Sequence, residues 1–514
     1  MEKSEIDHLL DEANTLGVKM HVLGGQLRYR TTKSALTEQF RAKLHGSRRE
    51  LIAALSGPDF YPREEQGTVP VLQYSRVLVE RIRSGAWGVD FSNATHSVLR
   101  YHGHLDLDAF RASIACLVSR CRILSARVIN TPAGPQFTFD QQRNISLKVE
   151  DLSGVESDDI EARAIRKAHE LVWAPLDIDA GPLFRVFAIK LRDAEYLVGF
   201  VVHHFICDFT SCTIVIVEIL QEYMRQRGQP VAAPVRAHLQ YADYVITMND
   251  WIRGAGARRR LAHWKRTLAG AKPTRIPPDV DNRASSVAEV CREPFHLGVE
   301  QTRALQRLSR EKAVTPFEVV LATKIVALSR ALASPDVTVI AMLSGRDDPR
   351  LNDMIGLVTT RVALRVPVAV NMTFAALLSL VHEVCSEAYA NQVPYPLVEE
   401  LLSASGAATV FPMINFMDAD VFEQATQGAH SQWNRIYLQS PVIMGTAQQF
   451  ASHSMTLSRT ASGIHGFLGY SSLLYKRKTI CDFLSNLLQL LKDVLRDPDA
   501  RLHSLAEPAD ACAP

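Results

Sequence analysis

The chain has 514 residues, of which 47% are hydrophobic and 22% charged, and its formal net charge is +2. This length allows two or three globular domains, and the composition excludes a disordered chain. The near-neutral charge gives no reason to expect nucleic acid or an anionic membrane as a partner, and no apolar stretch is long enough to cross a bilayer. Because residues 1–5 are polar and lead into no apolar signal core, we expect a cytoplasmic location.

The eight cysteines form no CxxC pair and no Cys/His pattern with zinc spacing, so we expect free thiols and no metal site. The sequence also lacks a GxGxxG motif before a helix and a P-loop motif, so no nucleotide fingerprint is present. These features favour a protein that binds no cofactor of its own.

Residues 1–57 are predicted to form a small separate unit. Apolar residues recur at helical spacing over residues 6–16. Two alternating segments, 19–23 and 26–30, flank a Gly-Gly pair, which is a strong signal for a β-hairpin. A further helix is expected at 36–55, with an interruption at the Gly-Ser pair inside it.

Basic residues dominate the second part of this unit. Residues 17–49 hold eight lysines and arginines against Glu38 as their acidic counterpart. One explanation is a solvated basic face. The other is a dock for an acidic peptide, which can add a strand at the free edge of a hairpin. The basic residues that we assign to such a dock are Lys19, Arg28, Arg30 and Lys33.

Beyond a polar linker at 58–67, helices and strands alternate, which is typical of an α/β layout. We expect a helix at 69–82, a strand at 95–101, a helix at 107–120 and a strand at 122–130.

A comparable series begins after a loop near residues 273–281. We expect a strand at 293–297, helices at 300–312 and 316–333, and a strand at 337–343. The chain therefore contains two similar α/β halves.

A pair of histidines is the most informative feature of the first half. An apolar, strand-like run at 196–202 leads directly to His203 and His204, and Asp208 follows four residues after the second histidine. A helix-like segment begins near Thr213. Acyl transfer requires an imidazole of this kind, because neutral histidine can take a proton from an incoming amine or alcohol. The alternative is a packed core histidine, which is the more common role of a histidine in an apolar run.

Two cysteines flank this histidine pair. Cys207 and Cys212 could supply a nucleophile, but buried packing is the commoner role of such residues, and no second base adjoins them in sequence.

The HHxxxD sequence resembles the HHxxxDG core motif of nonribosomal peptide synthetase condensation domains, which are relatives of chloramphenicol acetyltransferase. Further segments resemble motifs of that family in the expected order, and together they cover about residues 68–505. These segments are 174–186, 241–244, 263–270, 345–346, 355–365 and 469–471.

The chain departs from the family pattern at several positions. Phe209 stands where the family has the glycine of its core motif, and a bulky residue there could narrow the tunnel or shift the backbone. Thr360 replaces an asparagine, and segments 120–125 and 391–396 keep only part of their motifs. His203 argues against the heterocyclising branch, which carries aspartate at that position. The departures suggest an unusual pair of substrates.

The resemblance implies a fold of two chloramphenicol-acetyltransferase-like lobes that form a V with a central tunnel. We place the lobes at 68–240 and 241–505, followed by a tail at 506–514. The order helix, hairpin and helices in residues 1–57 resembles the β-hairpin docking domains of some synthetase subunits. Those domains bind a short linear motif at the C-terminus of the upstream subunit.

The resemblance also implies roles for individual residues. In the catalytic motif, His204 is expected to hydrogen-bond the nucleophile and either to accept its proton or to stabilise the charged intermediate, whereas His203 is expected to be structural. Asp208 is expected to form an ion pair with Arg346 that holds the loop. The residues assigned to the tunnel wall are Phe209 and Ser211, and packing within the turn is the alternative role of Ser211.

The implied reaction transfers an acyl thioester from the phosphopantetheine arm of a carrier protein to a small acceptor. The sequence shows none of the adenylation, carrier or thioesterase modules that usually accompany a condensation domain, so we expect a free-standing enzyme that releases the chain. We favour an ester with an alcohol over an amide. The expected partners are an acyl carrier protein, the acidic C-terminal motif of an upstream subunit, and a small-molecule acceptor.

Three alternatives remain at this stage. The chain could be a non-catalytic adaptor, it could form an amide with a carrier-bound acceptor, or it could use coenzyme A as the acyl donor. The docking unit argues against coenzyme A, because a diffusible donor needs no peptide dock.

Overall fold

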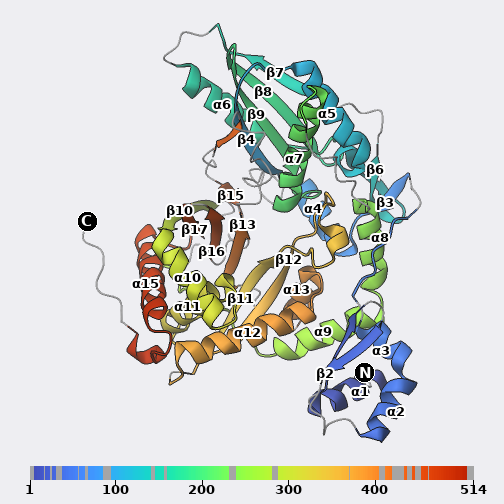
Figure 1. Ribbon diagram of the computed structural model, residues 1–514, viewed down its shortest axis with the longest axis vertical. Coiled ribbons are helices and arrows are strands. Elements are labelled where there is room, and N and C mark those ends of the chain that lie inside the picture. The colour runs from blue at the N-terminus through green and yellow to red at the C-terminus, as the bar shows by residue number, and fades with distance from the viewer. Residues whose placement is uncertain are drawn as a thin grey trace.

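The computed structural model describes most of the chain, and Figure 1 shows a small N-terminal unit beside two larger lobes, each built on a β-sheet. The expected tail at 506–514 lies outside the described residues. The described residues are 5–16, 18–23, 26–30, 37–55, 57–63, 67–84, 94–139, 145–154, 159–230, 239–279, 288–369, 371–404, 411–418, 433–436, 443–445, 453–460 and 462–505.

The N-terminal unit has a hydrophobic core of its own, and the predicted helix, hairpin and helices are confirmed in type and order. Thr37 caps the second helix by accepting the N–H of Phe40 over 3.2 Å, and Ser47 interrupts the helices where predicted. The elements are α1 (Glu5–Thr15), β1 (Lys19–Leu23), β2 (Gln26–Arg30), α2 (Glu38–Gly46) and α3 (Arg48–Leu55).

The first lobe is built on a five-stranded sheet in the order β14-β4-β9-β8-β7 (Figure 1). Its central strand β9 is apolar from residue 196 to residue 202, and both of its faces are buried there. Phe200 and Val202 pack in the core beneath α5 and α7, while Leu197 and Val201 pack in the core beneath α6. The elements are β4 (Ala94–His102), α5 (Leu107–Arg120), β7 (Leu147–Asp151), α6 (Ile160–Trp173), β8 (Phe184–Arg192), β9 (Glu195–His203), α7 (Phe209–Gln226) and β14 (Trp433–Ile436).

Two predictions at the base of this lobe are wrong in part. The helix expected at 69–82 begins as β3 (Thr68–Pro70), and only α4 (Arg76–Arg83) is helical after the turn η1 (Gln73–Ser75). The strand expected at 122–130 begins with the 3-10 helix η2 (Arg122–Ser125) and continues as β5 (Ala126–Thr131). Strand β3 and the start of β5 at Ala126 are fixed by pairing with β6 (Gly134–Phe139) in a separate sheet, β3-β6-β5. Local apolar spacing does not report such pairing.

The second lobe is built on a seven-stranded sheet in the order β12-β11-β13-β16-β17-β10-β15, and the four elements expected in its first part are confirmed with shifted ends. Its strands are β10 (Ala288–Leu297), β11 (Asp336–Leu343), β12 (Thr360–Pro367), β13 (Met413–Asp418), β15 (Ile443–Gly445), β16 (Ser454–Thr460) and β17 (Gly463–Ser471). Its helices are α9 (Ala255–Thr267), α10 (Val299–Glu311), α11 (Pro316–Ala331), α12 (Phe374–Ala390), α13 (Tyr395–Ala404) and α15 (Arg477–Arg496), with 3-10 turns at Pro349–Leu351 and Leu502–Ser504.

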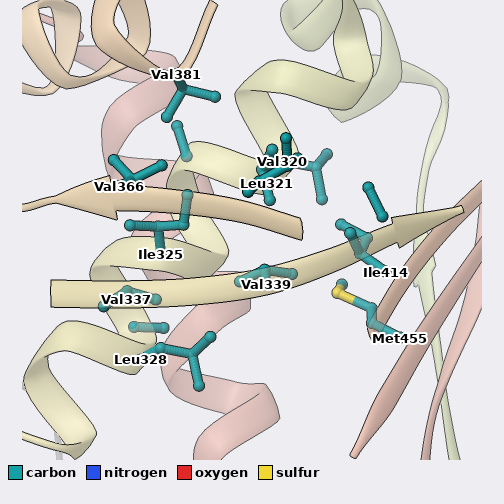
Figure 2. Packing of buried hydrophobic residues seen from close by; sticks show 14 of the residues in the cluster. Val320, Leu321, Ile325, Leu328, Val337, Val339, Val366, Val381, Ile414 and Met455 are labelled. Atoms are coloured by element: carbon teal, nitrogen blue, oxygen red, sulfur yellow. The ribbon is translucent and has the colours of Figure 1, made fainter. Parts of the chain in front are cut away.

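The core of the second lobe lies around α11. Figure 2 shows side chains of α11 gathered with those of the strands and of α12, among them Leu321, Ile325, Val339, Val366 and Val381. The N-terminus of α11 is closed by a capping box, in which Thr315 and Glu318 bond each other's backbone. Among the described residues no helix is both long and apolar enough for a membrane span.

Parts of the second half lie in the core of the first lobe. The boundary expected at residue 241 coincides with the start of α8 (Tyr241–Trp251), whose Tyr241 and Met248 are buried in that core. Met354 and Ile355, from the segment between β11 and β12, are buried there as well. The two lobes are therefore joined by shared packing at this segment.

A buried lysine lies inside the second lobe. The side chain of Lys324 on α11 is fully buried, and its Nζ donates to the carbonyl of Met413 over 2.6 Å. Burial lowers the pKa of Lys324 to about 7. The neighbouring His453 is also buried, and burial followed by the charge of Lys324 lowers the pKa of its imidazole well below the usual value.

Replacing Lys324 by methionine should flatten the dependence of stability on pH between about 7 and 10.5. Across this window the unfolded chain binds a proton that the folded chain does not, so the free energy of unfolding rises with pH by up to ~1.4 kcal/mol per unit from this group. Below about pH 7 both the folded and the unfolded chain hold the proton, so the destabilisation caused by burying the charged lysine has reached its full value. Urea denaturation across the window measures the slope. The exposed Lys265→Met is the control, and an unchanged slope in Lys324→Met contradicts the account.

Candidate active site

His203 is the last residue of β9 and is buried against the sheet. Its Nδ1 accepts the backbone N–H of Phe205 over 3.0 Å, so Nε2 carries the proton of the neutral ring. Burial, and next the neighbouring His204, lowers the pKa of His203 to about 3. A ring that stays neutral and whose Nδ1 lone pair is occupied is suited to a structural role.

His204 lies in the turn after β9, and its side chain is exposed. Its Nδ1 is 2.6 Å from the carbonyl oxygen of Cys207. A carbonyl can only accept, so Nδ1 carries the proton and Nε2 keeps its lone pair. The two adjacent histidines are thus held in opposite tautomers, and only His204 presents an accessible basic nitrogen.

Asp208 caps the N-terminus of α7 and is buried, with 1% of its surface exposed. Its carboxylate accepts the backbone N–H of Ser211 over 2.8 Å, that of Val358 over 3.0 Å and that of Thr359 over 3.1 Å. Arg346 Nη2 adds bonds of 3.0 and 3.2 Å to the two oxygens. A carboxylate so fully bonded anchors the turn to the segment that carries Val358 and Thr359.

The ion pair expected between Asp208 and Arg346 is present, and it joins the two halves of the chain. Only 5% of the Arg346 side chain is exposed. Its other terminal nitrogen, Nη1, donates to the carbonyl oxygens of Leu351 and Met354. The guanidinium therefore fixes the segment between β11 and β12 onto the turn that carries His204.

The structure corrects two expectations next to this pair. Ser211 is fully buried and its hydroxyl is bonded within the protein, so it does not lie on a tunnel wall. Phe209 is the first residue of α7, where ordinary helical angles hold, so it does not force an unusual backbone. Among the described residues the non-glycine positions with positive φ are Ala313 and Ala333. The side chain of Phe209 is partly buried.

A cysteine nucleophile is excluded at this turn. Cys207 is fully buried, and its Sγ donates to the carbonyl of Asp208 over 3.2 Å. Burial, and next the contact with Cys212, raises the pKa of the Cys207 thiol well above its usual value, so no reactive thiolate forms at neutral pH.

The sequence did not identify the backbone groups that complete the site. The N–H groups of Val358 and Thr359 bind Asp208, and Gly356 lies against the ring of Tyr241. A Cβ at Gly356 would come within 2.2 Å of that ring, so glycine is required there. The sequence did show that segment 355–365 resembles a family motif. That resemblance does not indicate that the backbone of this segment binds Asp208.

The dock and the tunnel are described only in part. The strand register places Lys19 opposite Arg30 and His21 opposite Arg28. Met20 and Leu27 of the same hairpin pack against the core of the unit. The expected dock residue Lys33 lies outside the described residues. The tunnel stays a prediction.

Two family models match the chain. The condensation domain matches residues 92–511, and the TubC N-terminal docking domain matches residues 6–56. One of the linear gramicidin synthase proteins of Brevibacillus parabrevis is 24% identical over 502 residues, which are 96% of this chain and 10% of that protein. The chain spans a tenth or less of the length of this and two further linear gramicidin synthase proteins that it matches.

Solved structures share the fold. The cyclization-docking bidomain of EpoB from Sorangium cellulosum has a TM-score of 0.69 at 19% identity and covers 96% of this chain and 99% of its own. A condensation domain that mediates chain release from the enacyloxin polyketide synthase has a TM-score of 0.67 at 20% identity, covering 100% of this chain and 97% of its own. These likenesses show the chloramphenicol-acetyltransferase-like fold of two lobes. The chain belongs to the condensation-domain family and carries a docking domain of the TubC type at its N-terminus.

Proposed function

We propose that the chain releases an acyl group from the phosphopantetheine thioester of an acyl carrier protein onto a small, freely diffusing alcohol or amine. The observation that carries this proposal is the accessible Nε2 of His204, left basic because Nδ1 is bonded to the carbonyl of Cys207. An intact and rigidly held base of this kind argues against a non-catalytic adaptor, for which no such tautomer is needed.

In the proposed reaction the acceptor oxygen or nitrogen attacks the thioester carbonyl carbon. A C–O or C–N bond forms, the C–S bond breaks, and His204 Nε2 takes the proton of the acceptor. The imidazolium then gives that proton to the departing thiolate of the phosphopantetheine arm. Asp208 and Arg346 take no part in proton transfer, since they hold the turn in place.

We favour an ester product over an amide. Support comes from the unusual residues near the site, Phe209 and Thr360, which indicate a non-standard acceptor. Further support is the likeness along the whole chain to the enacyloxin structure, whose protein mediates chain release. This second support is an analogy, because it compares the fold and domain order of the two proteins and not their sites.

The test incubates the protein with a loaded carrier and a panel of small alcohols and amines, and measures the mass of the released product. An ester is cleaved by mild hydroxide and an amide is not. An acceptor that reacts only when tethered to a second carrier protein overturns the release model. An amide from a free acceptor overturns only the preference for an ester.

The partner at the N-terminal unit is proposed to be an acidic segment at the C-terminus of an upstream subunit. The register of the hairpin pairs Lys19 with Arg30, two basic residues, at directly opposite positions of the strands. Like charges opposite one another destabilise a hairpin, and an anionic partner relieves that repulsion. The same attraction would guide the carrier towards the site.

Changing Arg28, Arg30 and Lys33 together to glutamate should abolish acyl transfer from the natural carrier at limiting concentration. Turnover of a soluble acyl thioester should be unchanged, because a small donor needs no dock. The affinity of the wild-type protein for the upstream segment should fall as salt rises, since the Debye length is about 8–10 Å at ordinary ionic strength.

The matched control makes the same charge change on a helix of the second lobe, far along the chain from the hairpin. Carrier turnover that survives the hairpin reversal, or that is lost equally in the control, contradicts the dock. The exposed arginines of α10 to reverse in the control are Arg303, Arg307 and Arg310.

A further inference from the structure

Ser211 holds both backbone groups of a single residue in the other half of the chain. Its Oγ donates to the carbonyl of Gly356 over 2.7 Å and accepts the N–H of Gly356 over 3.0 Å. It also accepts from Arg346 Nη2 over 2.8 Å. One hydroxyl can donate once and accept twice, so the bonding capacity of this fully buried group is filled.

Gly356 in turn contacts the peptide unit that orients His204. The backbone N–H of Asp208 donates to the carbonyl of Gly356 over 3.4 Å. That N–H belongs to the same planar peptide unit as the carbonyl of Cys207, which accepts from His204 Nδ1. The orientation of this plane therefore decides whether the carbonyl of Cys207 faces the imidazole.

We infer that Ser211 is a positioning residue for His204, acting through Gly356 and the peptide between Cys207 and Asp208. This rests on the proposed function, in which His204 is the base. Asp208 and Arg346 also hold this turn. The carbonyl of Gly356 accepts the N–H of the peptide between Cys207 and Asp208, and Ser211 donates to that same carbonyl. Without the hydroxyl, Gly356 keeps neither of its two bonds to α7, the peptide plane is free to tilt, and the tautomer of His204 is no longer fixed.

The first test is kinetic and uses a soluble acyl thioester with the best acceptor of the panel. Ser211→Ala should lower kcat on the order of 10-fold or more and leave KM nearly unchanged, because loss of the correct tautomer acts on the proton transfer and not on binding. Ser211→Thr restores a hydroxyl and should recover a large part of kcat. The matched control is Ser113→Ala, an equally buried helical serine of the first lobe whose Oγ bonds only the carbonyl of Ala109 among the described residues.

The second test does not depend on activity. In the full-length protein with ¹⁵N-labelled histidine, the wild-type His204 should show the Nδ1–H tautomer and His203 the Nε2–H tautomer, with His204→Ala used for assignment. Ser211→Ala should shift His204 towards the Nε2–H tautomer and leave the signals of His203 unchanged. In Ser113→Ala the signals of both histidines should match the wild type. If every thioester and acceptor proves inactive, this measurement still decides the inference, and the proposed function fails separately.

Two results would overturn the inference. One is a folded Ser211→Ala whose kcat and His204 tautomer both match the wild type. The other is an equal loss of kcat in Ser113→Ala, which would assign the effect to general loss of packing. If Ser211→Ala does not fold, a Ser211→Thr variant that keeps the fold but not the Nδ1–H tautomer contradicts the inference as well.

Discussion

His204→Ala should lower the rate of acyl transfer at least about 10²-fold while the protein stays folded. The loss is expected because Nε2 of this residue is the proton acceptor in the proposed reaction, and Nδ1 has been fixed as the donor to Cys207. The fold should persist because the side chain is exposed. Single-turnover kinetics with a loaded carrier, together with thermal unfolding, measure both effects.

A matched control separates this effect from the loss of any surface histidine. His104 is exposed and lies between β4 and α5, outside the site, so His104→Ala should keep wild-type turnover. Near-normal turnover in a cleanly folded His204→Ala protein would remove the catalytic role from this residue.

Asp208→Ala should lower the free energy of unfolding by roughly 3–5 kcal/mol and reduce activity with it. The substitution leaves Arg346 buried without its carboxylate, and it frees three backbone N–H groups of Ser211, Val358 and Thr359. Asp208→Asn is the matched variant, because it keeps the shape and an acceptor oxygen but removes the charge. Chemical denaturation measures the change.

A double-mutant cycle tests the pairing itself. Asp208→Ala and Arg346→Ala combined should cost less than the sum of the two single changes, with a coupling of about 1 kcal/mol or more. Strict additivity would mean that the two groups do not stabilise each other. The ion pair would then not be what holds the two halves of the chain together.

The sequence predicted those parts of the molecule that depend on nearby residues. The alternation around a Gly-Gly pair is enough to specify the hairpin β1–β2, because a tight turn sets the register. The continuous apolar run before His203 likewise indicates a strand with the histidines at its end. The Asp208–Arg346 pair was expected from resemblance to the family and is present.

The parts that the sequence did not predict depend on distant partners. The start of the helix expected at 69–82 is the strand β3, because Val69 pairs with Phe137 of β6. For Ser211 a tunnel wall and packing within the turn were both open, and its hydroxyl is bound to Gly356, 145 positions later. The local spacing of apolar residues does not depend on either distant partner. Both contacts therefore become visible only in the folded chain.

In the proposed reaction an acyl group passes from a carrier thioester to a free acceptor, with His204 as the base. The most direct measurement is the intact mass of the loaded carrier protein, followed with time in the presence of the protein and one small alcohol or amine. Loss of the acyl mass should require both the acceptor and the wild-type protein, and it should be at least about 10²-fold slower with His204→Ala. Discharge at equal rates with both proteins, or discharge that does not depend on any free acceptor, would contradict the proposed reaction.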